Sequence, residues 1–378
     1  MTSELSSLCS YAKGKVSVDT LSKRNYVSTE NMVPNKGGIV DAGALPSAQY
    51  TQQYMKDDIL VSNIRPYFKK IWMADDDGGC SNDVLVFRAE CGCDSTFLYY
   101  VLANDAFFNY ASATSKGTKM PRGDKTAIMQ YEVPCFNHET QLRIGKLLRS
   151  IDDRITVNKK INDNLYAQAK AIFDNHFINI DAIPAGWRKG NLLDIANYLN
   201  GLAMQKFRPQ GHEIGLPVLK IKELRQGSCD DSSELCSLSI KPEYIIHNGD
   251  VIFSWSGSLL VDIWCGGTCG LNQHLFKVTS DVYDKWFYYL WTAHHLARFI
   301  AIAADKATTM GHIKREELAK AEVLIPCEED YTSFNSIMQP IFELIISNRI
   351  ESRKLAALRD ELLPKLMTGE IDVSDVQF

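Results

Sequence analysis

The sequence predicts an α+β protein of two similar modules, each followed by a long helix. The two helices are expected to pair as an antiparallel coiled coil, giving the molecule pseudo-twofold symmetry. Three observations support this prediction. The chain has 378 residues, more than one hydrophobic core usually serves. Short motifs recur at a spacing of about 190 residues, and each copy ends in a stretch with helical periodicity.

The internal repeat consists of matching motifs in the same order. The matched pairs are Asp58–Ser62 with Asp250–Ser254, Ile71-Trp72 with Ile263-Trp264, Asn82 with Asn272, Lys116–Met120 with Lys306–Met310, and Val133-Pro134 with Ile325-Pro326. The offset drifts slightly, as expected where loops differ in length on a shared scaffold. We therefore expect two copies of one fold with different loops.

Each module combines short apolar runs with an aromatic helical segment. The runs expected to form strands are Asp58–Ser62, Asp83–Phe87, Asp250–Ser254 and His274–Val278. The segments expected to form helices are Phe97–Tyr110 and Lys285–Ala304. This mixture predicts an α+β module.

A long helix follows each module. Ile144, Leu148, Ile151 and Ile155 form one helical stripe, and a helix from about Glu139 to Ile178 would be about 60 Å long. A second stripe begins at Ile341 and runs toward Pro364, which is expected to end or kink the helix. A helix of this length with a single apolar seam needs a partner. The alternative is that each helix docks only on its own module.

Domain boundaries follow from these elements. A segment rich in Pro and Gly, Asn179–Trp187, is expected to be the linker between the copies. The predicted segments are residues 1–137 and 179–330 for the two modules, and residues 138–178 and 331–378 for the helices.

Composition excludes several classes of protein. Hydrophobic content of 45% and charged content of 23% are globular values, and the longest apolar runs are far too short to span a bilayer. No secretory signal is visible at the N-terminus, so a cytoplasmic location is expected. The ten cysteines have irregular spacings, which favours reduced thiols over a zinc site.

The sequence lacks the common catalytic motifs. The sequence contains no GxxxxGK[ST] phosphate loop, no glycine-rich cofactor turn after a strand and no Asn-Pro-Pro-aromatic run. His294-His295 lies in an aromatic segment and is expected to pack or face solvent rather than bind metal. We therefore assign this chain no catalytic residue, no metal ligand and no cofactor of its own.

With these features together, the chain resembles the DNA specificity (S) subunits of type I restriction-modification systems. The duplication carries the resemblance, along with the motifs Ile183–Trp187, Leu193–Ala196, Gly249–Ser254 and Leu362–Ile371. The first module departs from the family pattern because it begins at Leu5-Ser6-Ser7-Leu8 without a Pro-x-Gly-Trp start. Its N-terminal boundary is therefore less well defined.

The resemblance implies a non-catalytic binding subunit. Its modules would be target recognition domains, each reading one half of a bipartite site in double-stranded DNA. Its helices would set the distance between the halves and dock two methyltransferase subunits, with restriction/translocase subunits as further partners. S-adenosylmethionine, ATP and magnesium would belong to those partners. The alternatives are a self-contained DNA nuclease or modifying enzyme with a scattered active site, and an interaction scaffold with no DNA role.

Candidate DNA-binding residues lie in basic or hydroxyl-rich loops. Arg can bind guanine bidentately, and Lys attracts phosphate. The candidates are Arg65, Lys69, Lys70, Lys116, Thr118, Lys119, Arg122 and Lys125 in the first module, and Ser254, Ser256, Ser258, Lys306, Thr308, Thr309, His312, Lys314 and Arg315 in the second. The simpler interpretation is a solvated loop, with Asp75–Asp77 neutralising the first cluster.

Two further features remain open or limit these candidates. Trp255 fits a core position as well as a DNA-facing one, and turn formation is the commoner role for Asn82 and Asn272. The net charge of −5 and pI near 5.9 predict weak DNA binding by the chain alone and tight binding in an assembled complex.

Overall fold

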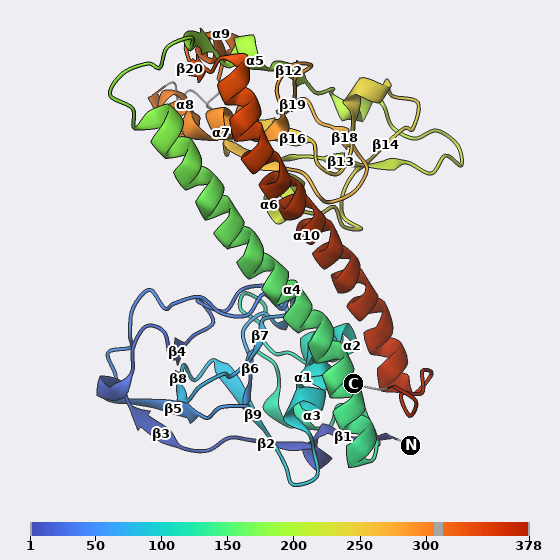
Figure 1. The fold of residues 1–378 in the computed structure, drawn as a ribbon. Coiled ribbons are helices and arrows are strands. Elements are labelled where there is room, and N and C mark those ends of the chain that lie inside the picture. The colour runs from blue at the N-terminus through green and yellow to red at the C-terminus, as the bar shows by residue number, and fades with distance from the viewer. Residues whose placement is uncertain (1, 306–312, 377–378) are drawn as a thin grey trace. The chain divides into compact units, whose positions relative to one another are not determined.

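The computed structural model describes residues 2–305 and 313–376 (Figure 1). The chain forms two compact units. Unit 1 comprises Met1–Asp153 and Leu355–Phe378, and unit 2 comprises Arg154–Lys354. Each unit therefore contains one module and a part of both long helices.

Unit 1 holds the first module. Its strands are β1 (Thr2–Glu4), β2 (Cys9–Tyr11), β3 (Lys15–Ser17), β4 (Tyr26–Val27), β5 (Tyr50–Tyr54), β6 (Ile59–Ser62), β7 (Ile71–Met73), β8 (Gly78–Cys80), β9 (Val84–Ala89) and β10 (Glu132–Pro134). Its short helices are α1 (Ser95–Ala103), α2 (Asp105–Ala113) and α3 (Lys125–Met129).

Unit 2 holds the second module. Its strands are β11 (Arg188–Asn191), β12 (Asn197–Asn200), β13 (Leu216–Leu219), β14 (Leu235–Cys236), β15 (Ile245–Ile246), β16 (Val251–Ser254), β17 (Leu260–Ile263), β18 (Cys269–Leu271), β19 (Leu275–Thr279) and β20 (Glu322–Ile325). Its short helices are α5 (Leu192–Ile195), α6 (Ile221–Gln226), α7 (Lys285–His294), α8 (Leu296–Asp305) and α9 (Arg315–Ala319).

The two modules share one sheet topology. An antiparallel sheet of order β2-β9-β6-β7 in unit 1 matches β12-β19-β16-β17 in unit 2. The pair β1-β10 matches β11-β20. A second sheet contains β4-β8-β5 in unit 1 and β13-β18-β15 in unit 2, with the same parallel and antiparallel pairings. The internal repeat predicted from the sequence therefore corresponds to two modules with the same fold.

The modules differ at the edges of the second sheet. In unit 1 the extra strand β3 pairs with β5, whereas in unit 2 the extra strand β14 pairs with β13. The extra strand therefore lies at the β5 edge of the sheet in unit 1. In unit 2 it lies at the β13 edge, which corresponds to the β4 edge of unit 1.

Strand register corrects two of the matched motifs. Ile59 faces Met73 and Val251 faces Ile263, so Met73, rather than Ile71, is the counterpart of Ile263. Ser62 faces Val84, and the matching Ser254 faces Leu275, so the counterpart of Asn82 is the residue two before Leu275, which is Gln273. Alignment by short motifs differs from alignment by strand register by one or two residues, because the loops between the strands differ in length.

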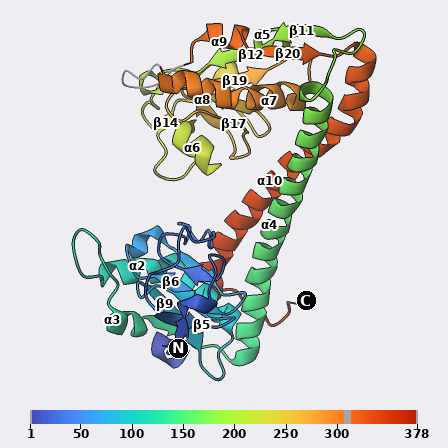
Figure 2. The same ribbon diagram turned by 90° about the vertical axis from the view of Figure 1, so that its left-hand side faces the viewer.

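Both faces of the main sheet are covered, and this explains its continuous apolar strands. In β6, Ile59 and Val61 pack into the core beneath α1 and α2, while Leu60 packs into a separate cluster on the second sheet. In unit 2, Val251 and Phe253 likewise pack on the helical side and Ile252 on the other. Figure 2 shows α7 and α8 lying along their sheet.

The long helices are α4 (His138–Phe173), which continues as a π-helical turn over Asp174–Ile178, and α10 (Glu328–Thr368). Helix α10 continues past Pro364 to Thr368, so of the two outcomes expected at that proline, an end or a kink, the helix end does not occur. The segment between the modules, up to Trp187, is irregular as predicted. It is held in place by the Trp187 indole, which donates to Asp330 at 2.7 Å.

Contacts in unit 2 show that α4 and α10 pack in antiparallel orientation. Asn158 donates to Glu351 at 2.8 Å, and Asn162 donates to the carbonyl of Ile345 at 3.1 Å. Rising numbers on α4 therefore meet falling numbers on α10. In unit 1, Arg359 of α10 pairs with Asp152 of α4 at 2.6 Å. The expected pairing of the helices is confirmed.

Among the described residues, no helix combines the length and apolar character needed to cross a membrane.

Candidate functional site

The loop after β6 presents two exposed aromatic rings beside a basic residue. Arg65 and Lys69 both adopt left-handed backbone conformations, with φ of 50° and 51°, and between them Pro66–Phe68 forms a 3-10 turn. Tyr67 and Phe68 are 51% and 38% exposed, and their ring centroids are 4.8 Å apart. The Arg65 guanidinium lies 6.0 Å from the Phe68 ring centroid. Such rings offer faces on which a planar ligand can stack.

The loop of residues 116–122 joins this turn. Its ends are bridged by two hydrogen bonds between the backbones of Lys116 and Arg122, at 2.8 and 2.9 Å. Arg65 donates its backbone N–H to Pro121 at 2.8 Å and a guanidinium nitrogen to the carbonyl of Lys119 at 3.4 Å. The two clusters predicted separately from the sequence thus form one surface. We call Arg65–Phe68 and residues 116–122 together the module 1 loop surface.

Several cations on or next to this surface have acidic partners. Arg122 pairs with Asp83 at 3.1 Å, Lys69 pairs with Asp105 at 2.8 Å, and Lys116 pairs with Asp124. Lys119 is exposed, and no acidic side chain in the described part of the chain pairs with it. The neutralising residues are therefore Asp83, Asp105 and Asp124, and the expected role of residues 75–77 is not observed.

Hydrogen bonds from these cations lower the pKa of two of the carboxylates. Burial alone would raise the pKa of Asp105, but its bonds with Lys69 and Lys36 hold that pKa below the usual value. The bond from Lys116, together with the backbone N–H groups of Ala127 and Thr126, lowers the pKa of Asp124. Asp124 caps the N-terminus of α3 in this way. These acids stay ionised at neutral pH.

The two remaining candidate cations of this module, Lys70 and Lys125, differ in accessibility. Lys70 is half-buried and donates to the carbonyl of Thr29 at 2.5 Å, and burial lowers its pKa. Lys125 is exposed at the start of α3, with its ammonium 5.9 Å from the Tyr11 ring centroid. Thr118 is exposed on the module 1 loop surface.

In the second module, Ser254 and Ser256 are buried, at 0% and 1% exposure. The Ser254 hydroxyl donates to the carbonyl of Ser258 at 3.0 Å, and the Ser256 hydroxyl lies 3.0 Å from Nδ1 of His274. Their expected contact with DNA is therefore corrected, because both hydroxyls are enclosed and already paired. Ser62 closes the turn after β6 in the same way, donating to Ile64 at 3.1 Å. The repeated serine is a structural residue, whereas Ser258 is exposed.

The other predicted residues of this module lie around residue 310. Lys306, Thr308, Thr309 and His312 fall outside the described residues. Lys314 and Arg315 are exposed at the start of α9. The backbone N–H of Ile313 donates to the carbonyl of Trp255 at 3.1 Å, so Ile313, just before α9, contacts the turn after β16. Trp255 is half-buried against the core, and its indole donates to Asn200 at 3.0 Å.

A polar cavity of about 440 Å³ adjoins that turn, and sequence reasoning missed it. Its lining includes Arg208, Lys220, Lys222, Gln273 and His274. Arg208 and Lys220 both pair with Glu234, at 3.1 and 2.6 Å. These residues come from four segments without periodicity. Only the paired lysines flanking Ile221 offered a local signal.

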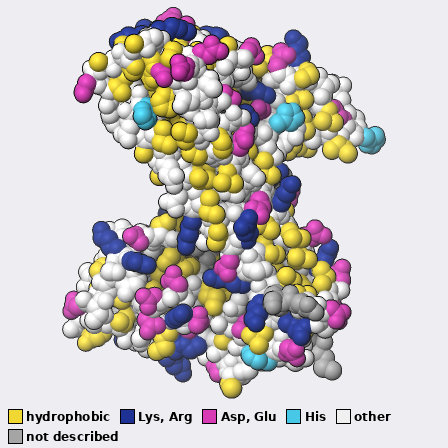
Figure 3. All heavy atoms as spheres, in the orientation of Figure 1, with side chains coloured by type: hydrophobic (Ala, Val, Ile, Leu, Met, Phe, Trp, Pro, Cys, Tyr) yellow, Lys and Arg dark blue, Asp and Glu magenta, His cyan; other side chains and the backbone are white. Residues whose placement is uncertain are grey.

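Charge on the surface is mixed. Figure 3 shows Lys and Arg side chains scattered among Asp and Glu side chains on the face drawn, rather than gathered in one patch. This agrees with the net charge of −5. Attraction of an anion must therefore depend on the loops described above.

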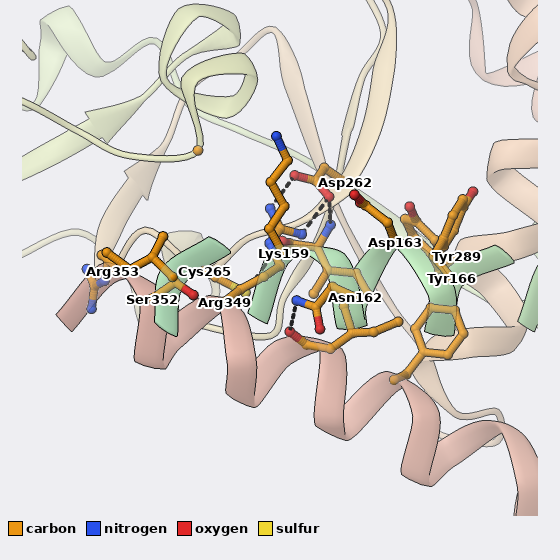
Figure 4. Close-up of a pocket in the computed structure, with 15 residues that line it drawn as sticks. Lys159, Asn162, Asp163, Tyr166, Asp262, Cys265, Tyr289, Arg349, Ser352 and Arg353 are labelled. Carbon is orange, nitrogen blue, oxygen red and sulfur yellow. Dashed lines mark hydrogen bonds and ion pairs between the residues drawn. The ribbon is translucent and has the colours of Figure 1, made fainter. Parts of the chain in front are cut away.

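A second cavity in unit 2, of about 490 Å³, lies between α4, α10 and β17 (Figure 4). Arg349 of α10 donates two hydrogen bonds to Asp262 of β17, at 2.8 and 2.7 Å. Tyr166 of α4 and Tyr289 of α7 lie at the other end of the cavity, with ring centroids 6.3 Å apart. The ion pair anchors α10 to the main sheet of the second module.

The described residues contain no group of three or more His, Cys, Asp or Glu side chains that could hold a metal ion. His295 packs as expected: its ring lies against Trp291, and Nε2 is 2.8 Å from the carbonyl of Glu322. Burial lowers the pKa of His295 and of His294.

Comparisons with known proteins give a consistent answer. A family model described as the type I restriction modification DNA specificity domain matches residues 1–167. The MjaIX specificity subunit of Methanocaldococcus jannaschii is 27% identical over 75% of this chain and 71% of its own length. The HindI specificity subunit of Haemophilus influenzae is 20% identical over 92% of this chain and 94% of its own.

A solved structure shares the fold. The S subunit of a type I restriction-modification system from M. genitalium superposes with a TM-score of 0.59 at 15% identity, covering 97% of this chain and 96% of that one.

Proposed function

The chain belongs to the DNA specificity subunits of type I restriction-modification systems, and from this premise we propose that its two modules read the two halves of one bipartite DNA site. The target recognition domains are residues 1–137 and 179–330, and residues 138–178 and 331–378 are the helical spacers. One observation carries the proposal: the sheet order β2-β9-β6-β7 recurs as β12-β19-β16-β17, so the chain carries two readers of one design. Because their loops differ in sequence, the half-sites differ too.

In the first module, we propose that DNA contacts the module 1 loop surface and its neighbours. The exposed Lys119 supplies attraction to phosphate, and Tyr67 and Phe68 supply apolar contact. Arg122 exchanges its pairing with Asp83 for a base or phosphate. The proposed residues are Arg65, Lys69, Lys70, Lys116, Thr118, Lys119, Arg122 and Lys125.

In the second module, the proposed contacts surround the turn after β16. The proposed residues there are the exposed Ser258, Lys314 and Arg315, together with Arg208 and Lys222 of the cavity described above. We retain Lys306, Thr308, Thr309 and His312 as proposed contacts on sequence grounds.

We propose that two methyltransferase subunits, and restriction/translocase subunits with them, dock on the long helices. Support comes from apolar side chains left exposed there within unit 2: Val157 and Ile161 on α4, and Ile337 and Leu344 on α10, are each 38–50% exposed. Exposed apolar residues on a helix suit a partner protein rather than water. S-adenosylmethionine, ATP and magnesium bind to those partners. The chain itself is non-catalytic and acts in the cytoplasm.

Reconstitution tests this function. The purified chain alone should neither methylate nor cleave DNA, and adding the methyltransferase subunit should give adenine methylation at one split sequence. Mapping methylated adenines across a genome that expresses both subunits would show two defined stretches separated by a fixed distance. Methylation or metal-dependent cleavage by the chain alone would instead support a self-contained enzyme.

The charge of the chain supplies a second test. At physiological salt the isolated chain should bind DNA weakly, since affinity rises with the number of phosphates neutralised and its net charge is −5. The assembled complex should bind tightly. Nanomolar binding by the isolated chain would contradict the proposal.

A further inference from the structure

The two modules place an amide side chain at the tip of the same turn. Ser62 faces Val84 and Ser254 faces Leu275, so the turns before β9 and β19 are equivalent. In one, the Ser81 hydroxyl accepts from the N–H of Asp83 at 3.3 Å. In the other, the Asn272 side chain accepts from the N–H of His274 at 3.2 Å. The residue between each pair is Asn82 in module 1 and Gln273 in module 2.

These amides differ from Asn272 in accessibility. Asn272 is buried, and its oxygen is used inside the turn. Asn82 is exposed, and no hydrogen bond joins its amide to another described residue. Gln273 is half-buried, and within the described part of the chain its amide has one hydrogen-bond partner, Nε2 of His274 at 3.4 Å. Both amides therefore retain donors and acceptors for a ligand.

Each amide also lines a cavity that contains cations. Asn82 shares a cavity of about 340 Å³ with Lys15, Gln52 and Lys125. Gln273 lies in the cavity of about 440 Å³ with Lys220 and Lys222. An amide in a cavity that also contains cations suits a base edge near phosphates.

The turns also join the surfaces proposed above for DNA contact. Asp83, beside Asn82, pairs with Arg122 of the module 1 loop surface. His274, beside Gln273, accepts or donates a hydrogen bond with Ser256 in the turn after β16. The amides are thus adjacent to the loops that would hold the DNA backbone.

We propose that Asn82 and Gln273 are the equivalent specificity-determining residues of the two modules, each reading one adenine in its half-site. An Asn or Gln amide matches adenine in the major groove because its oxygen accepts from N6–H and its N–H donates to N7. The inference rests on the proposed function. It assigns one amide residue to one adenine in each half-site.

The test uses the complex with the methyltransferase subunit and maps methylated sequences for each variant. Gln273→Ala should weaken discrimination at one adenine position of a single half-site by about 5- to 150-fold, leaving the other half unchanged. Asn82→Ala should do the same in the opposite half. Gln273→Glu should shift that position toward cytosine, whose N4 donates to a carboxylate.

A matched control is Gln226→Ala, which removes an exposed amide of the same module outside the cavity and should leave the sequence unchanged. The inference is overturned if the wild-type complex methylates a split sequence and neither amide variant alters it, or if both variants alter the same half. An altered position that is not adenine overturns the assignment of the base. A wild-type complex with no split sequence would instead refute the proposed function.

Discussion

Replacing Arg349 with methionine should lower the stability of unit 2, because the guanidinium holds α10 to the main sheet. It donates to both oxygens of Asp262, and the two side chains are only 30% and 27% exposed. Arg349→Met keeps most of the apolar stem and removes the charge. The Asp262 carboxylate then loses its ion-pair partner in a partly buried site.

The expected loss is about 2 kcal/mol of the free energy of unfolding. Removing one member of a fully buried pair costs about 3–5 kcal/mol, and hydrogen bonds to a charged group contribute about 1.5–3 kcal/mol. We take a value near the lower end because water still reaches about a third of each side chain. For a unit of this size, the corresponding fall in Tm is about 4–8 °C.

Tryptophan fluorescence during urea unfolding measures this loss selectively. Trp72 belongs to unit 1, whereas unit 2 contains Trp187, Trp255, Trp264, Trp286 and Trp291. The transition should move to lower urea with an unchanged slope, which indicates lost stability rather than a changed folded state.

The matched control is Arg154→Met. Arg154 pairs with Glu351 at 3.1 Å in the same unit, but the side chains are 53% and 40% exposed, so its removal should cost less than about 1 kcal/mol. If both variants lose the same stability, or if Arg349→Met stays within about 0.5 kcal/mol of wild type, burial is not what makes the Arg349 pair important.

Three further predictions concern DNA binding and pH. The double variant Lys119→Ala/Arg122→Ala should weaken DNA binding by the complex at all sequences and reduce the slope of log affinity against log salt by about 1–2; an unchanged slope would place the DNA elsewhere. Ser254→Ala should cost about 1 kcal/mol of unit 2 stability without altering the methylated sequence, and an altered sequence would refute its structural role. Burial lowers the pKa of His295 below its usual value of 6.5, so the unfolded chain takes up the proton first and unit 2 should lose stability as pH falls below about 6.5. His295→Gln should flatten that dependence in urea titrations between pH 7.5 and 5.5, and parallel curves for the two proteins would contradict this.

The strands of the main sheet could be predicted because their sequences are continuous apolar runs with acids at their starts. The structure explains the acids: Asp58 accepts from the N–H of Met55 and pairs with Arg88 at 2.6 Å, and Asp250 pairs with Lys277 at 2.9 Å. Each acid belongs to the turn that precedes the strand. The predicted strands therefore begin one residue before the observed ones.

The aromatic helices were predicted as single segments, and each is broken. Asn104 has an extended ψ of 138° and caps α2 through the N–H of Ala106. His295 ends α7 and bonds to Glu322 of β20. Asn before Asp is a recognisable cap signal, whereas the break at His295 depends on a contact 27 residues away that a local pattern cannot show.

The candidate site was predictable only where its residues adjoin in sequence. Lys116–Arg122 form one loop, and their charge is visible in the sequence. The cavity around Gln273 collects side chains from the segments that follow β13 and β18, from residues 205–208 and from Glu234. The equivalence of Gln273 with Asn82 follows from strand register. Burial of Ser254 was missed because a hydroxyl at a strand end fits a ligand contact and a turn closure equally well.

The core of unit 1 has a consequence for synthesis of the protein. Ile144 and Leu148 pack there against Leu363, Leu366 and Val373, which the ribosome adds more than two hundred residues later. At a translation rate of about 5–20 residues per second, the apolar surface of Ile144 and Leu148 stays uncovered for on the order of ten seconds or more. A nascent or prematurely terminated chain therefore exposes an apolar surface that chaperones and proteases can recognise, and only translation through residue 373 removes it.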